Sequence, residues 1–99
     1  MIWHIVRFDF DGVDDAVRAD LEAALAGLDT IDVVAVCHVA RDLEQPSVTG
    51  LVTAFATHAD LEAYRVHPEH VPVVDGLRAA GVVTTRIDIE LPSTLGPAA

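Results

Sequence analysis

An alternation of apolar and polar residues opens the chain and predicts a β-strand over residues 2–10. The even-numbered positions of this stretch are apolar apart from His4, whereas the odd-numbered positions combine Trp3 and Ile5 with charged residues. Successive side chains of a strand point to opposite faces of a sheet. The even-numbered residues, which include Val6 and Phe8, are therefore expected to face the core.

Runs rich in β-branched residues predict three further strands. The segments "VVAVCHVA" at residues 33–40 and "VTGLVTAFA" at residues 48–56 are joined by a short hairpin-like connection, and "VVTTRIDIEL" at residues 82–91 follows near the end of the chain. β-branched side chains pack well on the pleated surface of a sheet. The chain is thus expected to contain four strands.

Helical spacing predicts two helical regions between these strands. Apolar residues recur every three or four positions over residues 13–28, which indicates an amphipathic helix. The second region has two parts: a short helix over residues 59–66, capped by Thr57, and a helix that starts at Pro68 and stops at Gly81. Proline cannot continue a helix but suits its first turn, so the second region is expected to be broken in the middle.

The order β-α-β-β-α-β predicts an α+β protein with the ferredoxin-like arrangement, in which a four-stranded antiparallel sheet carries both helical regions on one face. The other face of the sheet would remain uncovered. Its expected residues are Trp3, Ile5, Thr85, Ile87 and Ile89, together with either Val34, Val36 and His38 or the set one residue away. This face is too apolar to contact water, so we expect a homodimer that pairs through the sheet faces.

Composition and charge narrow the classes of partner. The chain has 99 residues, of which 52% are hydrophobic, and this is enough for one small domain. Its formal charge of −10 repels phosphate backbones and anionic lipids, so neither nucleic acid nor a membrane is expected as a partner. A single cysteine, Cys37, and the lack of a basic leader or a long apolar run predict a cytoplasmic location.

The most informative stretch for chemistry is "YRVHPEH", which contains Tyr64, His67 and His70 on either side of Pro68. Helical spacing from Leu61 directs Tyr64 inward, and His70 shares a face with the apolar residues that follow it. A neutral imidazole accepts a proton near neutral pH, and a phenol donates a hydrogen bond to a developing enolate. Alternatively, Tyr64 and His70 are buried polar groups that hold the helix junction, and His67 is a structural cap.

Two further groups are candidate binding residues. His4 lies on the inward face of the first strand, together with Val6 and Phe8. Arg86 and Asp88 share one face of the last strand; if that face is the inner one, Asp88 would orient His70 by accepting its N–H, and Arg86 would neutralise Asp88 or bind an anionic substrate group. Alternatively, Arg86 and Asp88 form an ion pair on the surface.

The sequence predicts neither a metal site nor a cofactor. Five histidines are present, but none of the spacings HxH, HxxxH or HExxH occurs, and the pair His67 and His70 spans a proline. There is no glycine-rich phosphate loop. Cys37 lies within an apolar strand and is expected to be a small core residue.

Three segments of the chain resemble the stress-responsive α/β-barrel (Dabb) family. "WHIVRFDF" resembles the opening strand of that family, "FATHADLEAYRVHPEHVPVV" resembles its signature F-x-s-x-x-x-L-x-x-Y-x-x-H-P-x-H, and "RIDIEL" resembles its final strand. The resemblance implies a dimeric α+β barrel domain over residues 1–92, followed by a C-terminal tail over residues 93–99. Distant dimeric α+β barrels bind haem, and that alternative stays open.

The family resemblance also implies a site. A plant branch of the family consists of polyketide cyclases that use a tyrosine and a histidine, and these match Tyr64 and His70. Thr49 stands where such a cyclase can carry another histidine. Two hypotheses follow. The protein is a cofactor-independent acid-base enzyme for a small carbonyl or polyketide-like substrate, with His70 as base and Tyr64 as acid; or it is a non-catalytic, stress-associated dimer that binds a small apolar or carbonyl-containing ligand.

Overall fold

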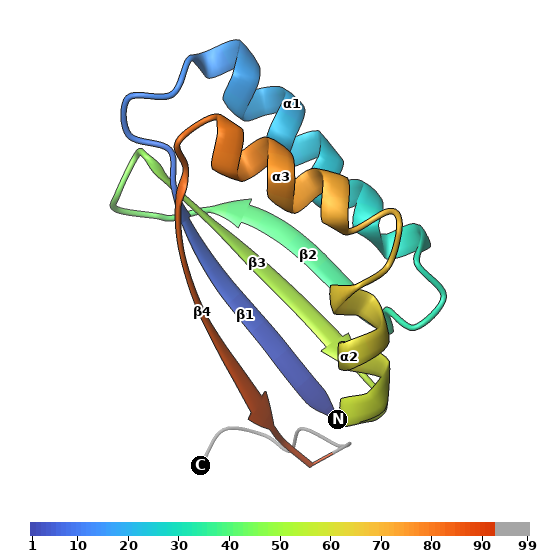
Figure 1. The fold of residues 1–99 in the computed structure, drawn as a ribbon. Coiled ribbons are helices and arrows are strands. Elements are labelled where there is room, and N and C mark those ends of the chain that lie inside the picture. Colours follow the sequence, from blue (N-terminus) through green and yellow to red (C-terminus); the bar gives the residue numbers. More distant parts are fainter. Residues whose placement is uncertain (93–99) are drawn as a thin grey trace.

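The computed structural model describes residues 1–92 and confirms the predicted ferredoxin-like arrangement, with the second helical region divided in two (Figure 1). The elements are β1 (Ile2–Asp9), α1 (Asp15–Ala26), the 3-10 helix η1 (Gly27–Thr30), β2 (Val36–Arg41), β3 (Val48–Phe55), α2 (His58–Arg65), α3 (Val71–Ala79) and β4 (Val83–Glu90). The tail predicted over residues 93–99 lies outside the described residues. The domain boundary at residue 92 therefore stays a prediction.

One antiparallel sheet of four strands in the order β2-β3-β1-β4 forms the base of the molecule. Figure 1 shows α1 and α3 lying across one face of this sheet, with α2 near the end where β1 begins. The register places His4 directly opposite Asp88 of β4 and Thr53 of β3. This alignment brings the side chains of His4 and Asp88 together in the candidate site. Among residues 1–92, no helix is long and apolar enough to cross a membrane.

The core lies between the helices and the inner face of the sheet, where the sequence alternation placed it. The even-numbered residues of β1 are buried there, and the side chains with no exposed surface include Phe55, Leu61 and Tyr64. These side chains come from β3 and α2, so the short α2 is held to the sheet by two residues three apart on one face. Burial of three such side chains stabilises the fold by roughly 1.5–3 kcal/mol each.

Caps and turns confirm most of the predicted helix ends. The Thr57 hydroxyl accepts a hydrogen bond from the Asp60 backbone N–H at 3.1 Å, as its N-cap role requires. Gly81 has a φ of +79°, a conformation that costs glycine little, and α3 ends just before it.

The predicted start of the last helix at Pro68 is wrong, since α3 begins at Val71. The chain turns over residues 68–70, where the Glu69 backbone N–H donates to His67 Nδ1 at 3.0 Å. The proline that occupies the first turn of α3 is Pro72. The second strand likewise begins at Val36, three residues later than predicted.

The outer face of the sheet is apolar and, within the described part of the chain, no helix covers it. Ile87 is 57% exposed, and its neighbours Trp3, Ile5 and Ile89 are half-buried. The register of β2 against β3 places Val36 and His38 on this face, as the first of the two sets considered for the second strand required. Val34 of that set precedes β2 and packs against the core instead.

Candidate active site

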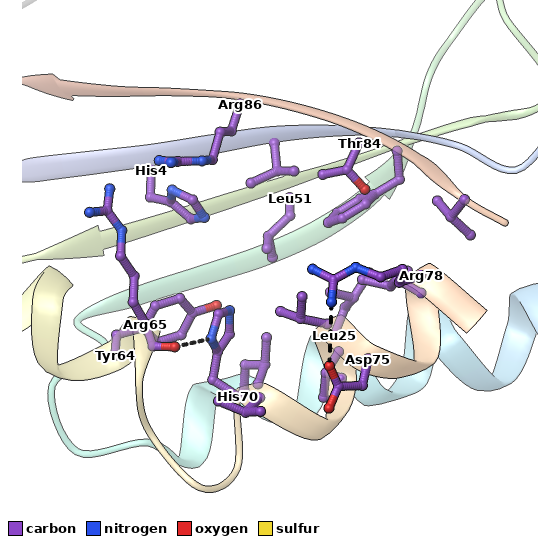
Figure 2. Close-up of a pocket in the computed structure, with 18 of the residues that line it drawn as sticks. His4, Leu25, Leu51, Tyr64, Arg65, His70, Asp75, Arg78, Thr84 and Arg86 are labelled. Atoms are coloured by element: carbon purple, nitrogen blue, oxygen red, sulfur yellow. Dashed lines mark hydrogen bonds and ion pairs between the residues drawn. The ribbon is translucent and has the colours of Figure 1, made fainter. Parts of the chain in front are cut away.

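A cavity of about 670 Å³ lies between the inner face of the sheet and the helices α2 and α3. Its floor is formed by apolar side chains of β1 and β3, and its other wall by residues along nearly the whole length of α3, with Leu25 of α1 and Leu28 of η1. Figure 2 shows Tyr64, His70, His4 and Arg65 together at one end of the cavity, whereas Thr84, Asp75 and Arg78 lie toward the other. A volume of this size accommodates a small organic ligand.

Tyr64 is the most deeply buried polar residue of this cavity. Its side chain has no exposed surface, and its ring packs at 4.2 Å from the ring of His70 and at 4.9 Å from that of Phe55, measured between centroids. The Tyr64 hydroxyl has no hydrogen-bond partner among residues 1–92. Burial raises the pKa of this phenol, so it stays protonated and can donate.

His70 precedes the first turn of α3 and is fixed by the end of α2. Its Nδ1–H donates to the Arg65 backbone carbonyl at 3.1 Å, which leaves Nε2 with a free lone pair on a residue that borders the cavity. Burial lowers the pKa of His70 despite the opposing effect of that hydrogen bond, and the nearby imidazoles of His4 and His67 lower it further. The imidazole is therefore a neutral acceptor at neutral pH.

Asp88 does not orient His70, and this part of the sequence hypothesis is wrong. Its Oδ1 accepts a hydrogen bond from His4 Nδ1 at 2.5 Å instead. The reason is the sheet register, which sets Asp88 directly across from His4, whereas His70 is held by a backbone carbonyl of α2.

Asp88 and Arg86 lie on the inner face of the sheet, which was one of the two alternatives that the sequence left open for the last strand. The second oxygen of Asp88 accepts from Arg65 Nη2 at 2.9 Å and also from Arg86 Nη1. Partial burial, the largest influence, would raise the pKa of Asp88, but the His4 hydrogen bond and the charges of His4, Arg86 and Arg65 together lower it. Asp88 is therefore an anion at neutral pH and links two arginines to His4.

His4, Val6, Phe8 and Arg86 border the cavity, but His67 does not. Two lining residues that the sequence hypothesis missed are Arg65 and Arg78. The sequence contains a signal that could have identified these two arginines. Arg65 lies four residues after Leu61, and Arg78 lies four residues after Val74, so each shares a helical face with an inward apolar residue. Long arginine side chains extend from such positions to the rim of a pocket.

Thr49, where a cyclase can carry another histidine, takes no part in the cavity. It is fully buried, accepts from Arg18 Nη2 at 3.0 Å and donates to Glu22 at 2.7 Å. Cys37 packs against the core as predicted, and burial raises the pKa of its thiol. Neither residue adds a reactive group to the site.

Comparison with known proteins gives a family and a fold. The Stress Responsive A/B Barrel Domain family matches residues 2–91. No protein with a curated description matches the chain. A Deinococcus radiodurans structure described as a candidate antibiotic biosynthesis monooxygenase has a TM-score of 0.82 and 14% identity, covering 100% of both chains.

Two other similar structures have different descriptions. A dimeric ferredoxin-like protein of unknown function from Thermobifida fusca has a TM-score of 0.79 and 20% identity, covering 91% of this chain and 90% of its own. SnoaB, a cofactor-independent oxygenase from Streptomyces nogalater, has a TM-score of 0.69 and 14% identity, covering 97% of both chains. At these identities the similarity concerns the fold.

Proposed function

The chain belongs to the stress-responsive A/B barrel domain family, and from that premise we propose that it is a cofactor-independent acid-base enzyme for a small carbonyl or polyketide-like compound. The observation that supports this most directly is the buried Tyr64 hydroxyl, which has no hydrogen-bond partner among residues 1–92 although it borders a cavity. A buried polar group without a partner is costly. A ligand oxygen in the cavity would satisfy it.

The proposed reaction begins with proton transfer to His70. Nε2 of the neutral imidazole accepts a proton from the carbon next to a ligand carbonyl. The electron pair of that C–H bond forms a carbon–carbon double bond, and the π pair of the carbonyl moves onto its oxygen, which gives an enolate. The Tyr64 hydroxyl donates a hydrogen bond to the enolate oxygen. Return of the proton from His70 to a different carbon completes an isomerisation. In an aldol-type ring closure, the enolate carbon attacks a second carbonyl group of the same molecule, and the proton passes from His70 to the new alkoxide oxygen.

The rest of the site is suited to such a step. The bond from His70 Nδ1–H to the Arg65 carbonyl holds the base in the tautomer that leaves Nε2 free. His4 lies edge to face against Tyr64 at 6.0 Å between centroids and is itself held by Asp88. The similar Streptomyces protein is described as cofactor-independent, which supports a reaction that uses only side chains.

Binding without chemistry is the second candidate function. In this role the cavity holds a small apolar or carbonyl-containing ligand, and Tyr64 and His70 only recognise its oxygen. The close packing of the two rings and the backbone bond of His70 favour it, because both also stabilise the junction between α2 and α3. The two candidate functions differ only in whether the bound ligand is converted into a product.

We propose further that two copies pair through the outer faces of their sheets. The exposed Ile87 and the half-buried Trp3 and Ile89 form a continuous apolar surface on adjacent strands. Such a surface is more apolar than water-facing sheets usually are. The similar Thermobifida protein is described as dimeric.

Hydrogen–deuterium exchange at carbon tests the proposed chemistry. The protein is mixed in D₂O with small enolisable ketones and β-polyketo thioesters, and loss of the proton signal next to the carbonyl is followed by NMR. We expect exchange above the buffer rate for at least one compound, abolished by His70→Ala. His67→Ala is the matched control, because His67 lies outside the cavity. Ligand-induced stabilisation with no exchange would leave the binding function, and equal exchange by His70→Ala would contradict the role of His70.

A further inference from the structure

The cavity concentrates positive charge in a strongly acidic chain. All six basic residues of the chain are arginines, against sixteen acidic residues. Three of these arginines, Arg65, Arg78 and Arg86, border the cavity, and the only acidic side chain that borders it within residues 1–92 is Asp75. Asp75 is paired with Arg78 at 3.8 Å near the rim. Arg65 and Arg86 are therefore the charged lining residues at the end of the cavity that holds Tyr64 and His70.

Asp88 gathers Arg65 and Arg86 without neutralising both. One oxygen of its carboxylate accepts from each guanidinium. Arg65 has a second acidic partner, Glu62, at 2.6 Å, whereas Arg86 has no other ion pair among the described residues. A guanidinium carries five N–H donors. Arg86 therefore keeps unused N–H donors, although the charges of Arg65, Arg86, Asp88 and Glu62 together sum to zero.

These donors lie beside the groups of the proposed reaction. Figure 2 shows Arg65 extending from α2 toward His4 and Arg86 above the end of the cavity that holds Tyr64 and His70. Much of the remaining lining is apolar and includes the buried Val6, Leu51 and Leu77. Its polar members are Thr84, Asp75 and Arg78. The site thus combines an apolar chamber with paired guanidiniums at one end, and guanidiniums match the two oxygens of a carboxylate.

We infer that the natural ligand is an apolar carboxylic acid whose carboxylate binds to Arg86 and Arg65. The inference rests on the proposed function, in which the same molecule presents its carbonyl group to Tyr64 and His70. It specifies the substrate class: an oxo acid, aliphatic or aromatic, with an ionised carboxylate and a separate enolisable carbonyl group, rather than a neutral ketone, ester or amide.

A matched pair of ligands tests this inference. Isothermal titration calorimetry would compare 1-naphthoate with 1-naphthamide, which have the same ring system and similar size but differ in charge. We expect the naphthoate to bind at least tenfold more tightly than the amide. Arg86→Gln should reduce that preference to less than threefold, and Arg86→Lys, which keeps the charge, should retain most of it.

Arg41→Gln is the control. Arg41 lies at the end of β2 on the helix side of the sheet, pairs with Glu22 and does not border the cavity, so its removal changes the net charge equally without touching the cavity. It should leave the preference for naphthoate unchanged. Equal affinities for the two ligands, no binding of the naphthoate, or an undiminished preference in Arg86→Gln would overturn the inference.

The result of the naphthoate titration can be distinguished from the result of the deuterium-exchange test of the proposed function. Binding is measured without turnover, so the preference for naphthoate can fail while deuterium exchange of a neutral ketone is retained. Conversely, His70→Ala should abolish exchange and still bind naphthoate through Arg86. A preference that persists in His70→Ala supports the carboxylate site whether or not the protein is an enzyme.

Discussion

Replacing Tyr64 with phenylalanine should leave the protein as stable as before or more stable, although Tyr64 has no exposed surface. Replacing a buried tyrosine with phenylalanine usually destabilises a protein, because the tyrosine hydroxyl has a hydrogen-bond partner that the change leaves unpaired. Here the hydroxyl has none among residues 1–92. Its desolvation in the folded state is therefore uncompensated, and such groups cost about 1–3 kcal/mol.

The expected change in the free energy of unfolding therefore lies between zero and about +2 kcal/mol, since the small space left by the hydroxyl offsets part of the gain. Activity should change in the opposite direction. Loss of one hydrogen-bond donor to an enolate oxygen should lower turnover about 10²- to 10³-fold, by analogy with removal of a single oxyanion donor. The two effects have different origins, so they should separate in one variant.

Urea unfolding followed by circular dichroism would measure the stability of wild type and Tyr64→Phe at the same protein concentration, because a dimer's stability depends on concentration. Leu61→Ala is the reference variant, since Leu61 is equally buried on the same helix. It should lose about 2–5 kcal/mol. A loss of more than about 1 kcal/mol in Tyr64→Phe would refute the reasoning, because it would mean that the hydroxyl is bonded in the folded protein.

Two other predictions concern pH and assembly. Because burial lowers the pKa of His70 below its ordinary 6.5 and the base must be unprotonated, the rate of carbon deuteration should rise with pH through a midpoint below 6.5 and be level at neutral pH; a midpoint at or above 6.5 would contradict this. Ile87→Asp should convert a dimer at micromolar concentration into monomer or aggregate in sedimentation velocity, because it places a charge in the apolar face. Val66→Asp, at a position that is 76% exposed on the helix side, should stay dimeric, and a wild-type monomer would disprove the assembly.

Local patterns in the sequence determined the elements and the inward direction of most candidate residues. The alternation in β1 placed His4 on the buried face and Trp3 on the outer one, because side chains of a strand alternate whatever the strand pairs with. The cap at Thr57 and the stop at Gly81 were predictable for the same reason, since each depends on the conformation of a few neighbouring residues. The inward direction of Tyr64 also followed from its helical spacing to Leu61.

Only the tertiary structure decided which polar groups meet. Asp88 bonds His4 and not His70 because the register of β1 against β4 aligns residues 84 positions apart in the chain, and no local pattern specifies that register. The partner of His70 is likewise a backbone carbonyl, which every residue possesses and which no side-chain motif can indicate. The two arginines beside Asp88 come together because α2 and β4 pack around the same cavity, and that depends on how the helices fill the space above the sheet.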